Sequence, residues 1–196
     1  GGTVAAGSVT LQAGGTTGAV GGSGAGQAIV VDAPNVAGIS GTGGFYITDP
    51  NTSGLTVASI TPASGGTAVT GIVSTGNVVL SATTGNLAVN NAVTVGSTAS
   101  LTAAGAITDN GSGTVTASNL WMSAGANIGT ATDALLTNVS TLAGISGTGL
   151  VGSSQGIFVQ ETSPSQDLTI GSFNTPDGTS RSGLDASLTG SAISVK

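Results

Sequence analysis

The stretch AGISGTG at residues 37–43 occurs a second time, letter for letter, at residues 143–149. The similarity extends to two following segments, GFYITD at 44–49 with GIFVQE at 156–161, and LTVAS at 55–59 with LTIGS at 168–172. The second copy also carries an insertion, Leu150–Gln155. Self-similarity over a long period is a signature of stacked repeat architectures. The sequence therefore predicts a chain built from repeated units of structure.

A shorter period lies inside the long one. An apolar residue, a small polar residue and an alanine follow one another from Leu80, from Leu101 and from Met122, at intervals of 21 residues. A period of about 20–22 residues with short strands in each unit is typical of a parallel β-solenoid. We therefore expect an all-β fold in which residues 1–196 form a single continuous solenoid segment, with a long internal repeat at approximately 8–110 and 120–196.

Local patterns agree with short strands. Apolar and small residues alternate, as in half-buried strands, at Val9–Leu11, Leu87–Val89, Val93–Val95 and Val115–Ala117. Between them lie Gly, Asn and Asp, which favour tight corners. Such corners are predicted at 49–51, 84–86, 109–111 and 177–178.

The segment Asp133–Leu142 could also form a helix, because an aspartate suited to an N-cap precedes apolar residues at helical spacing. Its counterpart in the first copy, residues 27–36, is rich in β-branched residues and contains Pro34. A proline in a helix interior removes a hydrogen bond and clashes with the preceding turn. Because equivalent repeats share a structure, we predict a strand at Asp133–Leu142.

The composition excludes several functions. Only 5% of residues are charged, the net charge is -6, and Arg181 and Lys196 are the only basic residues. Nucleic-acid binding requires basic residues to neutralise phosphates, and no apolar stretch is long enough to cross a bilayer. We therefore expect neither nucleic acid as a partner nor membrane insertion. Because the chain starts at Gly1 and both ends have mid-repeat sequence, we expect it to be a piece of a longer protein.

The chain contains no histidine and no cysteine, so a nucleophile and its base are hard to assemble. The eight acidic residues are Asp32, Asp49, Asp109, Asp133, Glu161, Asp167, Asp177 and Asp185. Most stand beside corner-forming residues, and Asp49 and Glu161 are equivalent in the long repeat, which favours a structural role at corners. We predict no catalytic, cofactor-binding or metal-binding residues, although an isolated calcium ion near Asp49 or Asp109 is a conceivable exception. Phe45 and Phe158 fall in equivalent stretches and are expected to fill the core. An alternative is that some of the aromatic residues protrude and dock a neighbouring filament or chain.

Three segments carry a resemblance to a known family: GNVVLSA at 76–82, SLTAAGAIT at 100–108 and SAGANIG at 123–129. In these the chain resembles the haemagglutinin-type repeats of large secreted bacterial exoproteins, which include filamentous-haemagglutinin-like adhesins and autotransporter passengers. The resemblance implies a right-handed β-helix, secretion to the extracellular space or cell surface, and a role in adhesion or in an extracellular matrix.

A solenoid cut at both ends exposes strand edges that can pair with further strands. We therefore expect self-association into filaments, end to end or laterally, and a structural function as a segment of an extracellular bacterial fibre, stalk or adhesin shaft. An alternative is a carbohydrate-binding or cell-adhesion module that recognises glycans on a host or neighbouring cell. A β-helix polysaccharide enzyme is the third possibility and requires acidic and aromatic residues gathered in a groove.

Overall fold

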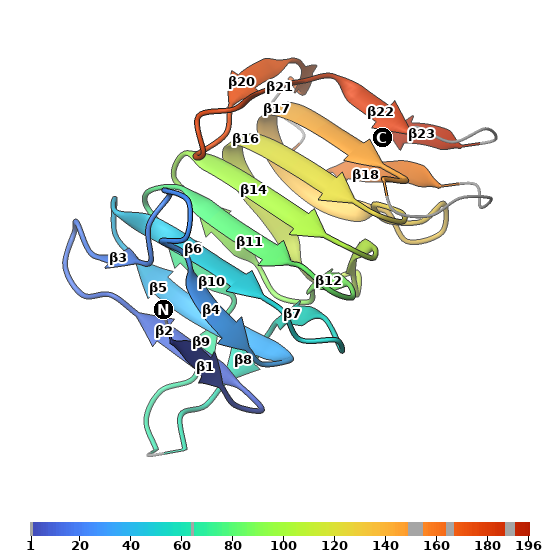
Figure 1. Cartoon of the computed structure of the whole chain (residues 1–196). Helices are drawn as coiled ribbons and strands as arrows, with labels where there is room; N and C mark the ends of the chain where they lie inside the picture. Colours follow the sequence, from blue (N-terminus) through green and yellow to red (C-terminus); the bar gives the residue numbers. More distant parts are fainter. Residues whose placement is uncertain (1, 64, 149–154, 164–166, 187–190) are drawn as a thin grey trace.

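A computed structural model describes residues 2–63, 65–148, 155–163, 167–186 and 191–196. These residues form strands and turns without a helix, and 19 of the strands belong to a single, mostly parallel sheet (Figure 1). The chain is therefore all-β, as predicted. Most of the insertion Leu150–Gln155 lies outside the described residues.

Two series of parallel strands run through this sheet. The first, here called the first ladder, comprises β1 (Thr3–Ala5), β4 (Ile29–Asp32), β6 (Gly44–Asp49), β11 (Val78–Ala82), β14 (Thr98–Ala103), the second half of β16 (Thr114–Ala124), the second half of β17 (Leu135–Ser146) and β22 (Leu184–Ala186). The second ladder comprises β2 (Val9–Gln12), β5 (Asn35–Ser40), β10 (Ile72–Ser74), β13 (Val93–Val95), the first halves of β16 and β17, β18 (Gly156–Glu161) and β23 (Ala192–Val195).

A third, shorter parallel series comprises β7 (Leu55–Val57), β12 (Leu87–Val89) and β15 (Ile107–Asp109). Two further short strands, β3 (Ala19–Val20) and β19 (Thr169–Ile170), pair with β6 and β17. Two antiparallel hairpins stand outside this arrangement. The first hairpin pairs β8 (Ser59–Ile60) with β9 (Val69–Thr70), and the second pairs β20 (Ser172–Asn174) with β21 (Ser180–Ser182).

The short period has a direct structural meaning. Leu80 is the ladder partner of Leu101, and Leu101 is the partner of Met122. All three side chains are fully buried. Inward residues alternate along each strand with outward ones, so identical positions of successive strands stack into an apolar core. For these three strands the predicted interval of 21 residues is therefore the distance in sequence between stacked strands. Over the whole stack the prediction is wrong, because the interval ranges from 18 residues between Ile29 and Ile47 to 40 between Gly144 and Leu184.

The segment that could have been a helix is a strand. β17 begins at Leu135 and continues to Ser146, with Leu135, Val139 and Leu142 all fully buried. It pairs along its length with β16. The prediction taken from the internal repeat is confirmed, because tertiary pairing and not local helical spacing decides this segment.

The internal repeat also extends to the pairing between strands. Ile29 pairs with Ile47 as Leu135 pairs with Val159. In the same way, β1 corresponds to the first half of β16. The pair of β5 with β10 corresponds to the pair of β17 with β22, and the pair of β6 with β11 corresponds to the pair of β18 with β23. The first hairpin corresponds to the second. We call residues 3–82 the first unit and residues 114–195 the second unit. The segment 83–113 between them contains β12 to β15.

The two units use the ladders in exchanged roles. β4, β6 and β11 of the first unit lie on the first ladder, whereas their equivalents, the first half of β17, β18 and β23, lie on the second. The second unit therefore repeats the first one further along the stack and on the opposite ladder. The first hairpin lies beside β5 on the second ladder, and the second hairpin lies beside β17 on the first ladder. The ladders differ because the two units exchange them.

Candidate functional site

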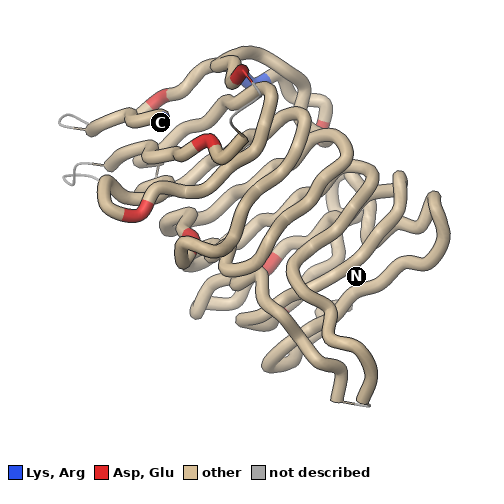
Figure 2. Tube along the Cα trace, turned by 180° about the vertical axis from the view of Figure 1, so that it is seen from behind, with Lys and Arg blue, Asp and Glu red and all other residues tan. Residues whose placement is uncertain are grey.

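The acidic residues lie at separate corners of the chain, and Figure 2 shows them distributed along the stack. Asp49 accepts a hydrogen bond from the backbone N–H of Asn51 at 3.0 Å, and the backbone of Ala33 also bonds to its carboxylate. Glu161 accepts the N–H of Ser163 and that of Val139, each at 3.1 Å. Both carboxylates therefore hold their own turn and a corner of the preceding layer, which confirms the corner role predicted for them.

Two other acids bond to backbone in a similar way. Asp109 accepts the N–H of Gly111 at 3.0 Å and that of Leu136 in the next layer at 2.9 Å. Asp177 accepts the hydroxyl of Thr175 at 2.6 Å and the N–H of Thr179 at 2.9 Å. The hydroxyl bond from Thr175 is the main reason that the pKa of Asp177 lies below its ordinary value, whereas burial raises the pKa of Asp49.

The remaining acids do not join them in a site. Asp32 accepts the side-chain amide of Asn51 at 2.8 Å, and Asp133, Asp167 and Asp185 are exposed on separate segments. Across the described part of the chain, no three His, Cys, Asp or Glu side chains gather closely enough to hold a metal ion. The hydrogen-bonded carboxylates therefore stabilise separate corners of the chain.

The aromatic residues correct one prediction. Phe45 is fully buried in the core, as expected, but Phe158 is only partly buried and is not a member of the core. In the strand register Phe45 corresponds to Ile157, and Phe158 corresponds to Tyr46. The aligned stretches 44–49 and 156–161 already pair Phe158 with Tyr46, but the prediction treated the two phenylalanines as equivalent and overlooked this difference of one position. A shift of one residue turns a strand side chain to the opposite face.

Tyr46 and Phe158 have the same local arrangement on the outer face, in which each ring packs over a glycine. A Cβ atom on Gly44 would lie within 2.6 Å of the Tyr46 ring, and a Cβ on Gly156 would collide with the Phe158 ring. Each ring thus lies over the backbone of the glycine two residues before it. The glycine is required because the ring occupies the space of a side chain.

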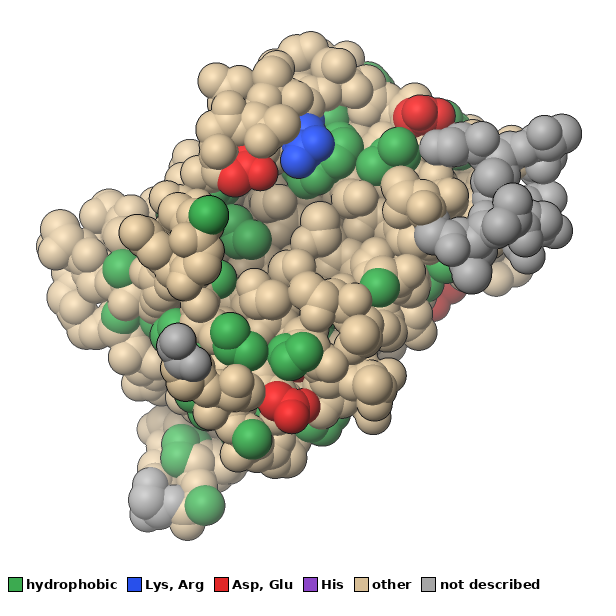
Figure 3. Space-filling view, in the orientation of Figure 1, with side chains coloured by type: hydrophobic (Ala, Val, Ile, Leu, Met, Phe, Trp, Pro, Cys, Tyr) green, Lys and Arg blue, Asp and Glu red, His purple; other side chains and the backbone are tan. Residues whose placement is uncertain are grey.

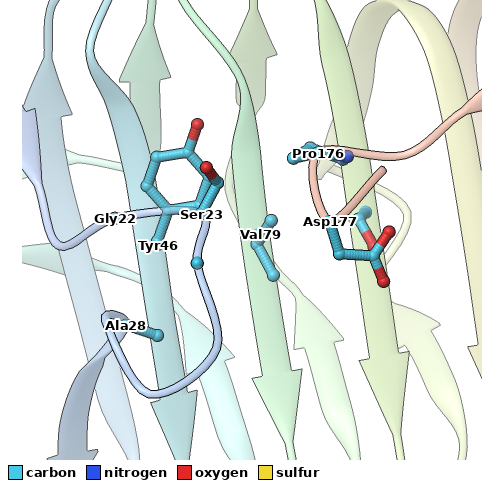
Figure 4. Close-up of a pocket in the computed structure, with 9 residues that line it drawn as sticks. Gly22, Ser23, Ala28, Tyr46, Val79, Pro176 and Asp177 are labelled. Atoms are coloured by element: carbon cyan, nitrogen blue, oxygen red, sulfur yellow. The ribbon is translucent and has the colours of Figure 1, made fainter. Parts of the chain in front are cut away.

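A cavity of about 100 Å³, here called the first pocket, lies beside Tyr46 on this outer face (Figure 4). Figure 4 shows Tyr46 and the loop carrying Ser23 on one side, Pro176 and Asp177 on the other, and Val79 between them. The loop belongs to the first unit, and Pro176 and Asp177 belong to the tip of the second hairpin. The pocket is therefore closed by two segments far apart in sequence.

A larger cavity of about 330 Å³, the second pocket, lies beside Phe158. Its lining residues Thr130, Ala131 and Phe158 correspond to Gly22, Ser23 and Tyr46 of the first pocket. The correspondence follows from the register, because Gly129 lies against the backbone of Phe158 and Leu135 just as Gly21 lies against Tyr46 and Ile29. The two pockets therefore share three equivalent lining residues, whereas the other residues that line the second pocket have no counterpart in the lining of the first.

Neither Tyr46 nor the tryptophan offers an open platform for a sugar ring. Tyr46 is 6% exposed and Trp121 is 8% exposed. The guanidinium of Arg181 covers Trp121 at 4.8 Å from the ring centroid and also lies 3.8 Å from the Asp177 carboxylate. Figure 3 shows the hydrophobic side chains on this face as separate small groups.

The two ends of the stack provide the largest difference between the units. Four apolar residues, Val4, Ile170, Ile193 and Val195, are 39–48% exposed. Their equivalents in the other unit are Val115, Val57, Val78 and Leu80, which are all fully buried. The exposed residues point into the core in the same way, but they belong to the first and last layers. They are core positions that lack a covering layer among the described residues.

Comparisons of the chain with protein-family models, with curated proteins and with solved structures find no match. No helix suited to crossing a membrane occurs among the residues described.

Proposed function

We propose that this chain is a segment of a right-handed parallel β-helix that serves as the structural shaft of a secreted bacterial fibre, stalk or adhesin, and that its ends take further layers of the same kind. The observation that carries the proposal is the exposure of core residues at both ends. In the interior, the equivalents of these residues are covered by the next layer. Right-handedness is the general rule for parallel strand connections, and secretion follows from the resemblance to exoprotein repeats.

The end surfaces suit stacking in chemistry as well as in shape. The outer edges of β1 and β23 carry backbone groups without a strand partner among the described residues. A covering layer would pair these groups and bury the apolar residues beside them. Complete burial of a valine or isoleucine contributes about 1.5–3 kcal/mol, so covering a residue that is 48% exposed, as Ile193 is, contributes roughly half of that.

The test replaces end residues by lysine. Val4→Lys and Ile193→Lys place a charge on the core surface of each end, and Val73→Lys is the matched control because Val73 is 43% exposed but lies outward on β10. We expect the unmodified chain and the control to form rods whose length rises with concentration, measured by sedimentation and electron microscopy. Both end variants should remain single particles. Rods that lengthen equally in all four proteins would contradict the proposal, as would an unmodified chain that stays a single particle throughout.

The structure supports the two alternative functions less well. Glycan binding through aromatic rings is not favoured, because Tyr46 and Trp121 are covered. A polysaccharide enzyme is not favoured, because the carboxylates lie at separate corners and bond to backbone. The structural role is the reading that the buried and exposed residues support together.

A further inference from the structure

The two hairpins occupy equivalent places in the two units. Ser59 pairs with Thr70 in the first hairpin as Ser172 pairs with Ser182 in the second. At the base of the first, the N–H of Gly71 donates to Ala58 at 2.9 Å. At the base of the second, the N–H of Gly183 donates to Gly171 at 3.1 Å. The hairpins therefore leave the stack in the same way, and a difference between them reflects what lies beneath their tips.

The tip of the second hairpin is docked. The hairpin begins beside β17, and its tip reaches back to the first pocket, where Pro176 and Asp177 lie with Tyr46 of β6 and Val79 of β11. Between β17 and β11 the first ladder contains β16 and β14, so the reach is three strand spacings, or about 14 Å. Thr175 at the base of this tip is only 4% exposed.

Among the described residues, no strand beyond β2 lies beneath the tip of the first hairpin. The hairpin begins beside β5, and only β2 precedes β5 on the second ladder. Figures 1 and 2 show the segment beyond β8 and β9 projecting away from the stack, past the end that carries β1 and β2. Thr61, Ala63 and the stretch 65–68 are exposed. By the internal repeat, this tip is directed at the place that a preceding unit would occupy.

The second pocket has the complementary position. It lies beside Phe158, near the opposite end of the stack, and three of its lining residues are equivalent to residues of the pocket that receives the tip of the second hairpin. Its lining includes Gln155, which is 4% exposed and whose Oε1 has no hydrogen-bond partner among the described residues. A buried amide oxygen of this kind is normally paired. Because this oxygen is closed to solvent, a docked tip would contact the exposed Ala131 and the partly exposed Phe158 rather than Gln155.

We propose that the tip of the first hairpin of one copy of this chain docks into the second pocket of the copy before it. The proposal rests on the end-to-end stacking proposed above. When β1 and β2 of the following copy stack on β22 and β23, the path from β5 of that copy runs over β2 and β23 to β18, which carries Phe158. This path is three strand spacings to β18, one fewer than the four that separate β17 from β6, which carries Tyr46, so a tip of similar reach spans it.

Cross-linking tests the contact directly, because the chain contains no cysteine. Ala131→Cys marks the second pocket and Ala63→Cys marks the hairpin tip; both positions are exposed. The two variants are mixed under conditions of rod formation and treated with a short bis-maleimide. The doubly substituted chain Ser23→Cys, Asp177→Cys calibrates the reaction, because these residues line the first pocket together. Ala88→Cys, on β12 in the middle of the stack, replaces Ala131→Cys in the matched control.

We expect the mixture to give a cross-linked pair of chains at about tenfold the yield of the control, because docking raises the local concentration of the two thiols. Rods that form with cross-linking at the control level would overturn the docking of the hairpin and leave end-to-end stacking in place. Cross-linking at the expected yield supports the docking. If no variant and no unmodified chain forms rods, the stacking function itself fails and the docking fails with it.

Discussion

Val4 and Val115 are both valines at the equivalent position of the two units, and the main difference between them is the layer that covers Val115 and is missing over Val4. Val115 is fully buried between Val93 on one side and Thr137 on the other. Val4 pairs with Val31 on one side and is 41% exposed on the other. Replacing each by alanine therefore measures the contribution of one covering layer.

The expected magnitudes follow from burial. Val115→Ala removes two methyl groups from a closed core, which costs about 1.6 kcal/mol of transfer free energy. The cavity left between two layers raises the total to about 2–3 kcal/mol. Val4→Ala should cost at most about 1 kcal/mol, because only part of the side chain leaves water on folding and the open end leaves no closed cavity.

Urea unfolding at a concentration below that of rod formation measures both values. The fluorescence of Trp121, on the same strand as Val115, and the circular dichroism of the strands serve as independent probes. In rods Val4 gains a cover, so Val4→Ala should also weaken association. Equal losses of stability for Val4→Ala and Val115→Ala in the single chain would refute the assignment of Val4 as an uncovered core position.

Three further predictions concern charge and backbone. Asp49→Asn should raise the urea midpoint at neutral pH: burial raises the pKa of Asp49 above its ordinary value of 3.8, so the fold is weakened as pH rises through that pKa. The difference from the unmodified chain should shrink on acidification, and a difference that grows would contradict this reasoning. Gly113→Ala should cost about 1–3 kcal/mol or more in urea unfolding, because its Cβ would collide with the carbonyl oxygen of Val89, whereas Gly7→Ala, with open space around it, should have little effect. Because few charges exist to be screened, the melting temperature should move by no more than about 2 °C between low and molar salt, and a larger shift would count against a structure held by apolar stacking.

The layers could be predicted from the sequence because their physics is local and periodic. The residues at Leu80, Leu101 and Met122 recur at the interval of one layer, and Asp49 and Glu161 are corner residues in both units. Even the strand at residues 135–146 followed from its counterpart in the first unit. In each case the same side-chain chemistry meets the same backbone environment twice.

The pockets could not be predicted in this way. Their walls depend on where the hairpin tips lie, and a tip such as Pro176–Asp177 contacts residues more than a hundred positions away. The aromatic pair shows a different limit, because the aligned stretches and the register both match Phe158 with Tyr46, yet the prediction placed Phe158 in the core together with Phe45. One residue of shift separates a core side chain from the wall of a pocket.

Strand edges alone would give this protein little control over its assembly. An unpaired edge accepts any strand that approaches it, in either direction and in several registers. The hairpin and the pocket add what the edges lack, because the projecting tip lies at the end with β1 and the second pocket lies toward the end with β23. Two copies that meet at their β1 ends bring together two tips and no second pocket, and two copies that meet at their β23 ends bring together two pockets and no tip. Only a head-to-tail arrangement places a tip against a pocket. Specificity then comes from the penalty on the wrong arrangements as much as from the contacts in the right one. The hairpin is therefore the part of each unit that gives a growing stack its direction.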